Sequence, residues 1–364
     1  MGLALGLVGL PNAGKSTLFN ALTRAGAAVA SYPFTTIEPN LGQVAVPDPR
    51  LQAVAGVIHP ARTVPATVRF IDIAGLVQGA SRGEGLGNRF LAHIREVDAI
   101  VHVVRCFSDA AAPLDEAGLY PVRDAEIVET ELALADLETV ERARERAATR
   151  AKAGEAAARE QGAVLARIAA ALAEGVPVRR QPLSDPERAL ARELRLLTAK
   201  PVIYVANLDE RLLPDGGPSA AALRALADRQ GAAFIGLAAR LEAELGDLPP
   251  DEAQAYMAAT GLEEPGANRL IRLGFATLGL VNFCTVLSNE VRAWPIPKGT
   301  TALSAAGEIH TDMARGFIRA EVIAWDALVA AGSMHAAREH GAVRTEGRDY
   351  QVADGDVITF RFAV

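Results

Sequence analysis

The sequence predicts an α/β protein with a doubly wound, mostly parallel sheet, an inserted helical coiled-coil domain and a smaller mixed α/β domain. Short apolar runs alternate with helical stretches early in the chain and again after residue 199, which indicates the sheet. The alternation of strands and helices stops in between, and a series of short β-like runs begins near residue 280. We therefore expect a discontinuous domain over 1–121 and 199–279, a helical insertion over 122–198, and a final domain over 280–364.

The expected strands of the main sheet are short apolar runs bounded by Gly, Pro or charged residues. Continuous runs of this kind are typical of strands buried on both faces of a parallel sheet. Helices are expected between them, at residues 16–24 and 86–97. The predicted strands are residues 3–8, 68–73, 99–104, 201–206 and 233–237.

The expected insertion is rich in Ala, Arg and Glu. Within 131–167, seven basic residues balance seven acidic ones. Leu165, Ile168 and Leu172 recur at spacings of three and four, which is typical of one face of a helix. A helical hairpin or short coiled coil is therefore predicted here.

The final domain contains short β-like runs separated by turn residues. Asp354-Gly355-Asp356 is expected to form a turn before the last strand. A small mixed α/β module is therefore predicted. Its expected strands are residues 282–287, 290–294, 318–322 and 357–362.

Composition argues against several classes of protein. The formal net charge of −7 does not suit a protein that coats nucleic acid through bulk electrostatics, although a local basic patch remains open. The two cysteines, Cys106 and Cys284, are too few for a disulfide framework and favour a reduced, cytoplasmic compartment. No apolar run is long enough for a membrane span. Residues 1–7 lack a basic leader and are expected to be a strand and not a signal peptide.

The strongest functional motif is Gly9-Leu-Pro-Asn-Ala-Gly14-Lys15-Ser16, which matches G-x-x-x-x-G-K-S/T between an expected strand and an expected helix. Backbone N–H groups of such a loop and the helix N-terminus face a polyanion. We expect Lys15 to contact the β- and γ-phosphates and Ser16 to bind Mg²⁺. The nucleotide-binding residues expected here are Gly9, Asn12, Ala13, Gly14, Lys15, Ser16 and Thr17.

Two further segments are expected to complete a magnesium and γ-phosphate site. Asp72 ends an apolar strand, where its carboxylate would hold Mg²⁺ through a water. Gly75, in Asp72-Ile-Ala-Gly75, leaves room for its N–H to approach the γ-phosphate, so Lys15 and Gly75 are the expected catalytic residues. In the threonine-containing loop between the two motifs, we favour Thr36 as the second protein ligand of Mg²⁺.

Base recognition is expected at Asn207-Leu208-Asp209-Glu210, after an apolar strand. Guanine-specific proteins carry N-K-x-D there, and the Asp accepts two hydrogen bonds from guanine while the Lys stem packs on the base. Leu208 and Glu210 replace these two residues, which removes the main discrimination against adenine. The sequence therefore favours ATP, or relaxed use of ATP and GTP. A second nucleotide-facing loop is expected at Ala238-Ala239.

These motifs together resemble those of the YchF/Obg-like ATPases, a branch of the Obg group within the translation-factor-related GTPase superfamily. The resemblance extends over essentially the whole chain, and the C-terminal run from Glu290 to Phe362 resembles a TGS domain. The other runs that carry it are Gly6–Thr17, Tyr32–Asn40, Asp72–Ala80, Gly83–Asn88, His93–Asp98 and Lys200–Glu210.

The resemblance implies an OBG-type G domain over 1–121 and 199–279, a coiled-coil domain over 122–198 and a TGS domain over 280–364. It implies an ATPase that prefers ATP over GTP and associates with ribosomes, with RNA contacts through the helical and TGS domains. It also implies a K⁺ site at Asn12, and we expect a monomer. Candidate basic groups on the last domain are Lys298, Arg315, Arg319, Arg338, Arg344 and Arg348.

Two leucines indicate slow intrinsic turnover. Leu76 stands where small signalling GTPases place a water-orienting Gln. Leu114 stands where many of the resembled proteins carry a histidine, so no general base is predicted. A nucleotide-gated ribosome- or RNA-binding scaffold with negligible turnover is therefore an alternative. A guanine-specific GTPase is a further alternative, which Leu208 and Glu210 disfavour.

Overall fold

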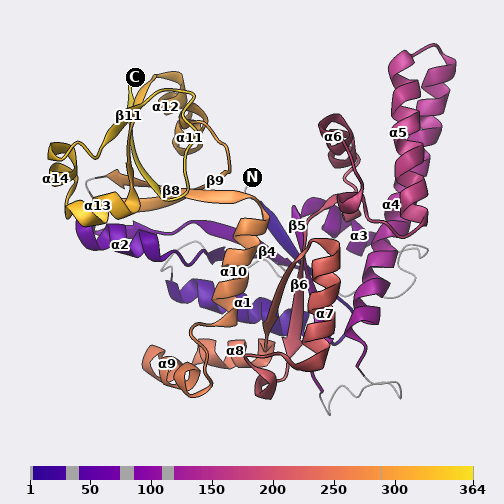
Figure 1. Cartoon of the computed structure of the whole chain (residues 1–364), viewed down its shortest axis with the longest axis horizontal. Coiled ribbons are helices and arrows are strands. Elements are labelled where there is room, and N and C mark those ends of the chain that lie inside the picture. Colours follow the sequence, from indigo (N-terminus) through magenta and orange to yellow (C-terminus); the bar gives the residue numbers. More distant parts are fainter. Residues whose placement is uncertain (1–2, 30–40, 74–85, 109–118, 288, 364) are drawn as a thin grey trace. The chain divides into compact units, whose positions relative to one another are not determined.

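The computed structural model describes residues 3–29, 41–73, 86–108, 119–287 and 289–363 (Figure 1). Contacts divide the chain into two compact units. The first unit comprises residues 1–24, 36–42 and 69–270, and the second comprises 25–35, 43–68 and 271–364.

The first unit is built on the sheet that the sequence predicted. β1 pairs in parallel with β4 and β5, and β5, β6 and β7 continue the parallel ladder, which confirms the α/β fold class. The strands, in sheet order, are β2 (Leu41–Ala45), β4 (Thr67–Asp72), β1 (Ala4–Val8), β5 (Ala99–Cys106), β6 (Val202–Leu208) and β7 (Ala233–Leu237).

Helices follow these strands, as expected for a doubly wound sheet. Apolar residues of β1, β5 and β6 form one buried core with α3, α4 and α7. Strand β6 runs two residues further than predicted, because Asn207 and Leu208 pair with Arg105 and Cys106 of β5. The helices are α1 (Lys15–Val29), α3 (Leu86–Glu96), α7 (Gly217–Gln230), α8 (Ala239–Asp247), α9 (Pro250–Ala259) and α10 (Gly266–Thr277), with the 3₁₀ turn η3 at Glu210–Leu212.

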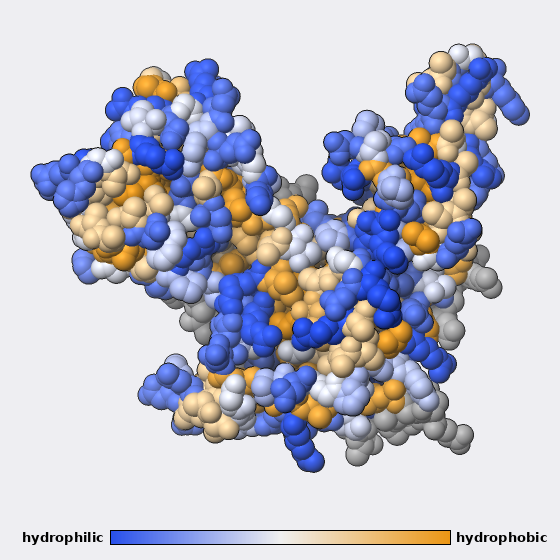
Figure 2. All heavy atoms as spheres, in the orientation of Figure 1, coloured by the Kyte–Doolittle hydropathy of each residue, from blue (hydrophilic) through white to orange (hydrophobic). Residues whose placement is uncertain are grey.

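The predicted helical insertion forms an arm of two packed helices, α4 (Pro121–Lys152) and α5 (Ala156–Ala173) (Figure 1). The start of α4 packs on the sheet, and its later turns share a second core with α5. Figure 2 shows hydrophilic side chains at the free end of this arm. The shorter elements that follow are η1 (Val178–Arg180), α6 (Asp185–Glu193) and η2 (Leu197–Ala199).

A buried carboxylate on α4 binds the end of the helical insertion, where the chain returns to the sheet. Asp136 is fully buried and accepts hydrogen bonds from the backbone N–H groups of Leu197 and Thr198, each at 2.7 Å. The Thr198 hydroxyl donates to the same carboxylate at 2.7 Å. Burial raises the pKa of Asp136, while these donors act against the rise. The hydrogen bonds therefore fix where the chain re-enters the sheet.

The second unit is the predicted mixed α/β module. β10 pairs antiparallel with β11 and β12, β8 pairs antiparallel with β9, and β12 and β8 are parallel. In sheet order the strands are β11 (Arg344–Glu346), β10 (Phe317–Ala324), β12 (Asp356–Phe362), β8 (Leu280–Leu287), β9 (Glu290–Pro297) and β3 (Arg62–Val64). The helices are α11 (Ala302–Ile309), α12 (Thr311–Arg315), α13 (Trp325–Ala331) and α14 (Met334–Glu339).

The sequence did not predict that residues 43–68 pack with this module. Strand β3 pairs in parallel with β9, and helix α2 (Pro49–Ile58) packs against α13. Arg50 contacts Asp354, 304 residues away in the chain.

The three-domain division remains a prediction. Among the described residues, the structure contains no helix that could span a membrane.

Candidate nucleotide-binding site

The phosphate loop, residues 9–16, joins the end of β1 to the start of α1. Its glycines allow close backbone approach: a Cβ on Gly9 would lie 2.3 Å from the carbonyl oxygen of Val103. Gly14 has φ +88°, and a Cβ there would lie 2.2 Å from Asn207 Nδ2. Asn12 is exposed at the loop surface with φ 62°, a conformation that asparagine tolerates better than most residues. The two glycines therefore let the loop lie close to β5 and β6.

Lys15 is the central cation of this loop. Only 8% of the residue is exposed, and Nζ donates to the carbonyl oxygens of Gly9 and Leu10, each at 3.1 Å. Burial lowers the pKa of Lys15, and the nearby Asp72 carboxylate acts in the opposite direction. The ammonium group is thus held beside the loop backbone, where a phosphate oxygen would be its natural counter-charge.

Ser16 and Asp72 come together from separate motifs. Ser16 Oγ donates to Asp72 Oδ2 at 2.9 Å, and within the described residues Asp72 Oδ1 is buried without a hydrogen-bond partner. A buried carboxylate oxygen is costly unless a cation or a water meets it. A hydroxyl beside a carboxylate is an oxygen donor set that suits a hard cation. These two side chains therefore fit Mg²⁺.

Several predicted site residues cannot be placed. Thr36 and Gly75 lie outside the described residues, and so do Leu76 and Leu114. Thr17 is exposed at the first turn of α1. Among the residues that the structure describes, no group of three His, Cys, Asp or Glu side chains could hold a metal ion.

Asn207 connects the phosphate loop to the loop after β7. Its side-chain Nδ2 donates to the carbonyl oxygen of Ala13, and its Oδ1 accepts from the backbone N–H of Ala239, both at 2.9 Å. Asn207 is 4% exposed, and Ala238 and Ala239 are also buried. The structure thus brings together three segments that the sequence assigned to the nucleotide. It shows that the Asn207 amide holds the two loops in place.

The residues that replace the guanine-specific motif have different surroundings. Leu208 is 4% exposed and belongs to the apolar core of the sheet, so its side chain is not free to cover a base. Glu210 is exposed, and its carboxylate accepts a hydrogen bond from the Tyr256 hydroxyl on α9. Sequence reasoning missed Tyr256, because nothing in its local pattern relates it to Glu210.

His102 is a buried histidine of the sheet. It lies on β5, is 1% exposed, and its ring lies 5.4 Å from the ring of Tyr204. Burial lowers the pKa of His102 to about 4, so the imidazole is neutral near pH 7. Glu129 raises this pKa, whereas Arg179 and Lys15 lower it further.

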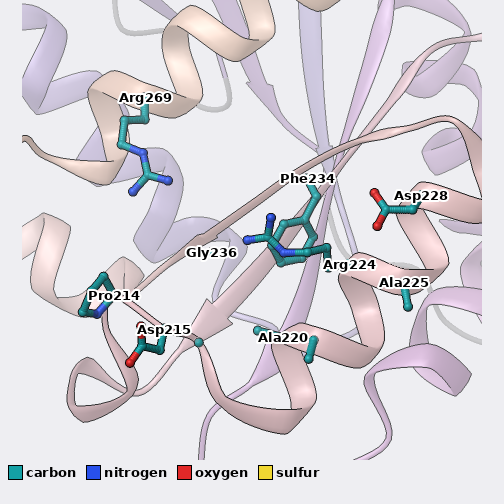
Figure 3. Close-up of a pocket in the computed structure, with 11 residues that line it drawn as sticks. Pro214, Asp215, Ala220, Arg224, Ala225, Asp228, Phe234, Gly236 and Arg269 are labelled. Atoms are coloured by element: carbon teal, nitrogen blue, oxygen red, sulfur yellow. The ribbon is translucent and has the colours of Figure 1, made fainter.

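A separate cavity of about 340 Å³ lies at the edge strand β7 (Figure 3). The guanidinium group of Arg224 stacks over the Phe234 ring at 4.5 Å, and Arg269 points into the space from α10. Asp215 and Asp228 balance the charge of these arginines. No residue of the phosphate loop lines this cavity, so it is distinct from the nucleotide site.

Comparison with known proteins identifies relatives of the same length. The family model described as "50S ribosome-binding GTPase" matches residues 4–143, and the YchF-GTPase C-terminal model, described as "Protein of unknown function (DUF933)", matches residues 280–363. "Ribosome-binding ATPase YchF" of Escherichia coli O157:H7 is 47% identical over 364 residues, covering 100% of both chains. The protein of that name from Bacillus subtilis (strain 168) is 46% identical over 366 residues, again covering 100% of both.

A solved structure extends this similarity to the fold. The structure of the Schizosaccharomyces pombe YchF GTPase matches with a TM-score of 0.89 and 36% sequence identity. The match covers 99% of this chain and 98% of that chain. The similarity therefore includes the phosphate loop, the helical insertion and the C-terminal module.

Proposed function

Because this chain belongs to the YchF family, we propose that it is a ribosome-binding ATPase that converts ATP and water to ADP and phosphate. We also propose that it is a monomer. Since its relatives are named for ribosome binding, we propose that it acts in the cytoplasm as a nucleotide-dependent switch. The observation that carries the proposal is the phosphate loop with Lys15 buried in it and with Ser16 bonded to Asp72.

Phosphate binding rests on the loop backbone and on Lys15. The N–H groups of residues 9–16 and the N-terminus of α1 present positive partial charge to the triphosphate. Lys15 adds a full charge at the β- and γ-phosphates. Because the ammonium is already buried beside the loop, little reorganisation is needed when the phosphates bind.

Magnesium would be held by Ser16 and Thr36 directly and by Asp72 through a water. When bound, Mg²⁺ neutralises charge on the β- and γ-phosphate oxygens and orients them for in-line attack. Asp72 Oδ1, which is buried and has no hydrogen-bond partner among the described residues, supports this assignment. Gly75 would offer its N–H to the γ-phosphate. Asn12, exposed on the loop, would place a K⁺ ion beside the phosphates, so turnover should be faster in KCl than in NaCl.

Slow unaided hydrolysis follows from the two leucines. Leu76 and Leu114 cannot orient or deprotonate water, so the chain contributes charge stabilisation and positioning without a general base. Turnover then depends on a partner that completes the site. The ribosome is the partner that the relatives' name indicates, and contacts would come from the helical insertion and the C-terminal module.

ATP is the proposed substrate, with GTP used less well. Guanine recognition needs a carboxylate directed at the base, whereas the Glu210 carboxylate is directed at the Tyr256 hydroxyl. Leu208 stands where guanine-specific proteins carry the lysine that packs on the base, and its side chain is buried, so no cation covers the base there. Adenine would be read through backbone groups near Leu208.

Single-turnover hydrolysis of ATP and of GTP, with and without ribosomes, tests the proposal. We expect slow ATP hydrolysis that ribosomes accelerate, with a smaller rate for GTP at subsaturating concentration. ATP binding without hydrolysis under either condition would instead establish the nucleotide-gated scaffold. A clear preference for GTP in a competition titration would overturn the assignment of the base.

A further inference from the structure

A second charged cavity, of about 470 Å³, lies in the first unit between the sheet and the helical insertion. We call it the amino-edge pocket, because it lies at the amino ends of the strands. Ala4, the first residue of β1, donates its N–H to Asp98 at 2.8 Å, and Ile100 of β5 donates to the carbonyl oxygen of Pro201 at 2.9 Å. The pocket is lined by Arg95, Glu96, Val97, Asp98, Arg192, Arg195, Leu196, Ala199, Lys200 and Pro201.

The amino-edge pocket is distinct from the nucleotide site. The phosphate loop follows the carboxyl end of β1, whereas Asp98 contacts the amino end of the same strand. Neighbouring strand β5 is eight residues long, which corresponds to roughly 26 Å at about 3.3 Å per residue. A ligand in this pocket therefore occupies the opposite edge of the sheet.

Two cations form the fixed floor of the pocket. The Lys200 ammonium donates to the carbonyl oxygens of Arg95 and Val97, the first at 3.3 Å. The guanidinium of Arg95 donates to the Thr139 hydroxyl at 3.2 Å and to the Arg195 carbonyl oxygen at 3.5 Å. These acceptors are neutral and orient both cations. The carboxylates that act on Lys200 through space are Asp98 and Asp136, and Asp136 also acts on Arg95.

Two more arginines project from the end of α6. Arg192 and Arg195 are both exposed, and within the described chain neither guanidinium has an ion-pair partner. The pocket is thus lined by four cations and two carboxylates, Glu96 and Asp98, and the buried Asp136 is a third carboxylate that acts on Arg95 and Lys200. This local excess of positive charge is unusual in a chain whose formal net charge is −7.

Arg195 occupies a backbone position that normally favours glycine. Its φ is 51°, Arg195 N–H donates to the Arg192 carbonyl at 2.9 Å, and Leu196 N–H donates to the Ala191 carbonyl at 3.1 Å. This is the Schellman pattern of hydrogen bonds, in which glycine is usual at the left-handed residue. An arginine there is disfavoured locally, by about 1 kcal/mol. Arg195 therefore adopts a locally unfavourable backbone conformation at a position where its residue lines the cationic pocket.

We propose that the amino-edge pocket binds the phosphodiester backbone of RNA. Guanidinium groups match phosphate oxygens through paired N–H donors, and clustered cations are the usual electrostatic footprint of RNA binding. The inference rests on the proposed ribosome binding and names one place where the contact is made. Arg192 and Arg195 supply the exposed contacts, while Arg95 and Lys200 supply a fixed positive field beneath them.

The test compares Arg192→Glu/Arg195→Glu with the matched control Arg180→Glu/Arg188→Glu. The control residues are also exposed arginines of the insertion, change the charge equally and do not line the pocket. We expect the pocket variant to bind ribosomes and a fluorescein-labelled ribosomal RNA helix at least about tenfold more weakly. The slope of log K against log salt should fall by about two, one for each lost phosphate contact.

Arg195→Gly separates an electrostatic role from a structural one. Glycine suits the left-handed backbone, so this variant should be at least as stable as the parent while it binds RNA more weakly. Unchanged RNA affinity in Arg195→Gly and in the double variant would overturn the proposal. So would an equal loss in the pocket and control variants, which would indicate a response to overall charge. ATP affinity should be the same in all variants, because the pocket lies away from the phosphate loop.

Two further outcomes are informative. If sodium tripolyphosphate, added with the nucleotide site saturated by ADP, binds to the parent and not to the pocket variant while RNA affinity is unchanged, the pocket binds a small phosphorylated molecule and the RNA proposal is wrong. If the parent fails to bind ribosomes, the proposed function fails. The RNA helix titration still decides the role of the pocket in that case.

Discussion

Asp72 shows how one side chain connects two motifs that lie far apart in the sequence. Its Oδ2 accepts from Ser16 at 2.9 Å, whereas Oδ1 is buried and has no hydrogen-bond partner in the described structure. The carboxylate is therefore positioned by the phosphate loop, and its other oxygen is the one that we propose to hold a water on Mg²⁺. This arrangement predicts that Asp72 matters for the metal more than for the nucleotide.

Asp72→Asn should weaken ATP binding in Mg²⁺ by at least about tenfold, as is usual when a group that supports a metal is changed. In EDTA the parent and the variant should bind ATP equally, because Asp72 contacts the nucleotide only through the metal. Titration of a fluorescent ATP analogue in both buffers measures the difference. Asp247→Asn, an exposed change of equal charge, is the control. An equal loss in both buffers would contradict the magnesium assignment.

His102 makes the stability of the fold depend on pH. Burial lowers its pKa to about 4, below the ordinary value of 6.5. Between these values the unfolded chain takes up a proton that the folded chain does not, so stability falls as pH decreases from 6.5 towards 4. The largest possible loss from this residue is about 3 kcal/mol.

Urea denaturation at several pH values measures the His102 effect. We expect the free energy of unfolding to fall below pH 6.5 in the parent and to fall less steeply in His102→Gln. His335→Gln removes an exposed histidine and should keep the parental slope. Parallel pH profiles for the parent and His102→Gln would show that other groups set the acid response.

At the scale of elements, the nucleotide site depends on how closely the phosphate loop, the end of β6 and the start of α8 approach one another. The Asn207 amide bonds the phosphate loop on one side and the start of α8 on the other. Gly14 is the point where the phosphate loop passes this amide, with 2.2 Å between Asn207 Nδ2 and the place of a Cβ. A side chain at Gly14 would therefore separate the two loops.

Gly14→Ala should abolish measurable ATP binding, because the methyl group displaces Asn207 and the left-handed φ of +88° disfavours alanine. Gly154→Ala is a matched control. Gly154 also has a left-handed φ, +99°, but nothing lies within 4 Å of its Cβ position. That variant should lose about 1 kcal/mol of stability and bind ATP normally. ATP binding by Gly14→Ala at parental affinity would show that the contact with Asn207 is dispensable.

At the scale of the whole molecule, part of the chain between the phosphate loop and Asp72 belongs to the second unit. Residues 43–68 leave the first unit after β2 begins and return within β4, which ends at Asp72. Arg50 holds this excursion to the C-terminal module, with salt bridges of 2.8 Å to Asp48 and to Asp354. The second unit is thus assembled from parts of the chain that are distant in sequence.

Arg50→Ala should destabilise the second unit by about 1–3 kcal/mol, because it leaves two carboxylates without their cation. Urea denaturation followed by Trp294 and Trp325 fluorescence reports on this unit, since both tryptophans of the chain lie in it. Arg315→Ala removes an 82% exposed arginine and should have almost no effect. A loss of stability of similar size in both variants would show that the salt bridges of Arg50 do not specifically stabilise the second unit.

The phosphate loop, the strand that ends at Asp72 and the alternation of strands and helices were all predictable, because each depends on residues close together in the chain. The helical insertion was predictable for the same reason. The Glu210–Tyr256 pair was not, since its partners come from different elements. The roles of Thr36 and Gly75 remain predictions.

The sequence alone determined the phosphate-binding chemistry, the α/β class and the loss of the guanine-specific residues, because these depend on local spacing and side-chain type. Only the tertiary structure decided that Asn207 holds two loops together, that Leu208 is buried, and that residues 43–68 join the C-terminal module. It also decided that four cations line one pocket at the amino edge of the sheet. The physical reason is that packing and hydrogen bonding select among many possible long-range contacts, and local sequence patterns carry no information about which partner is chosen.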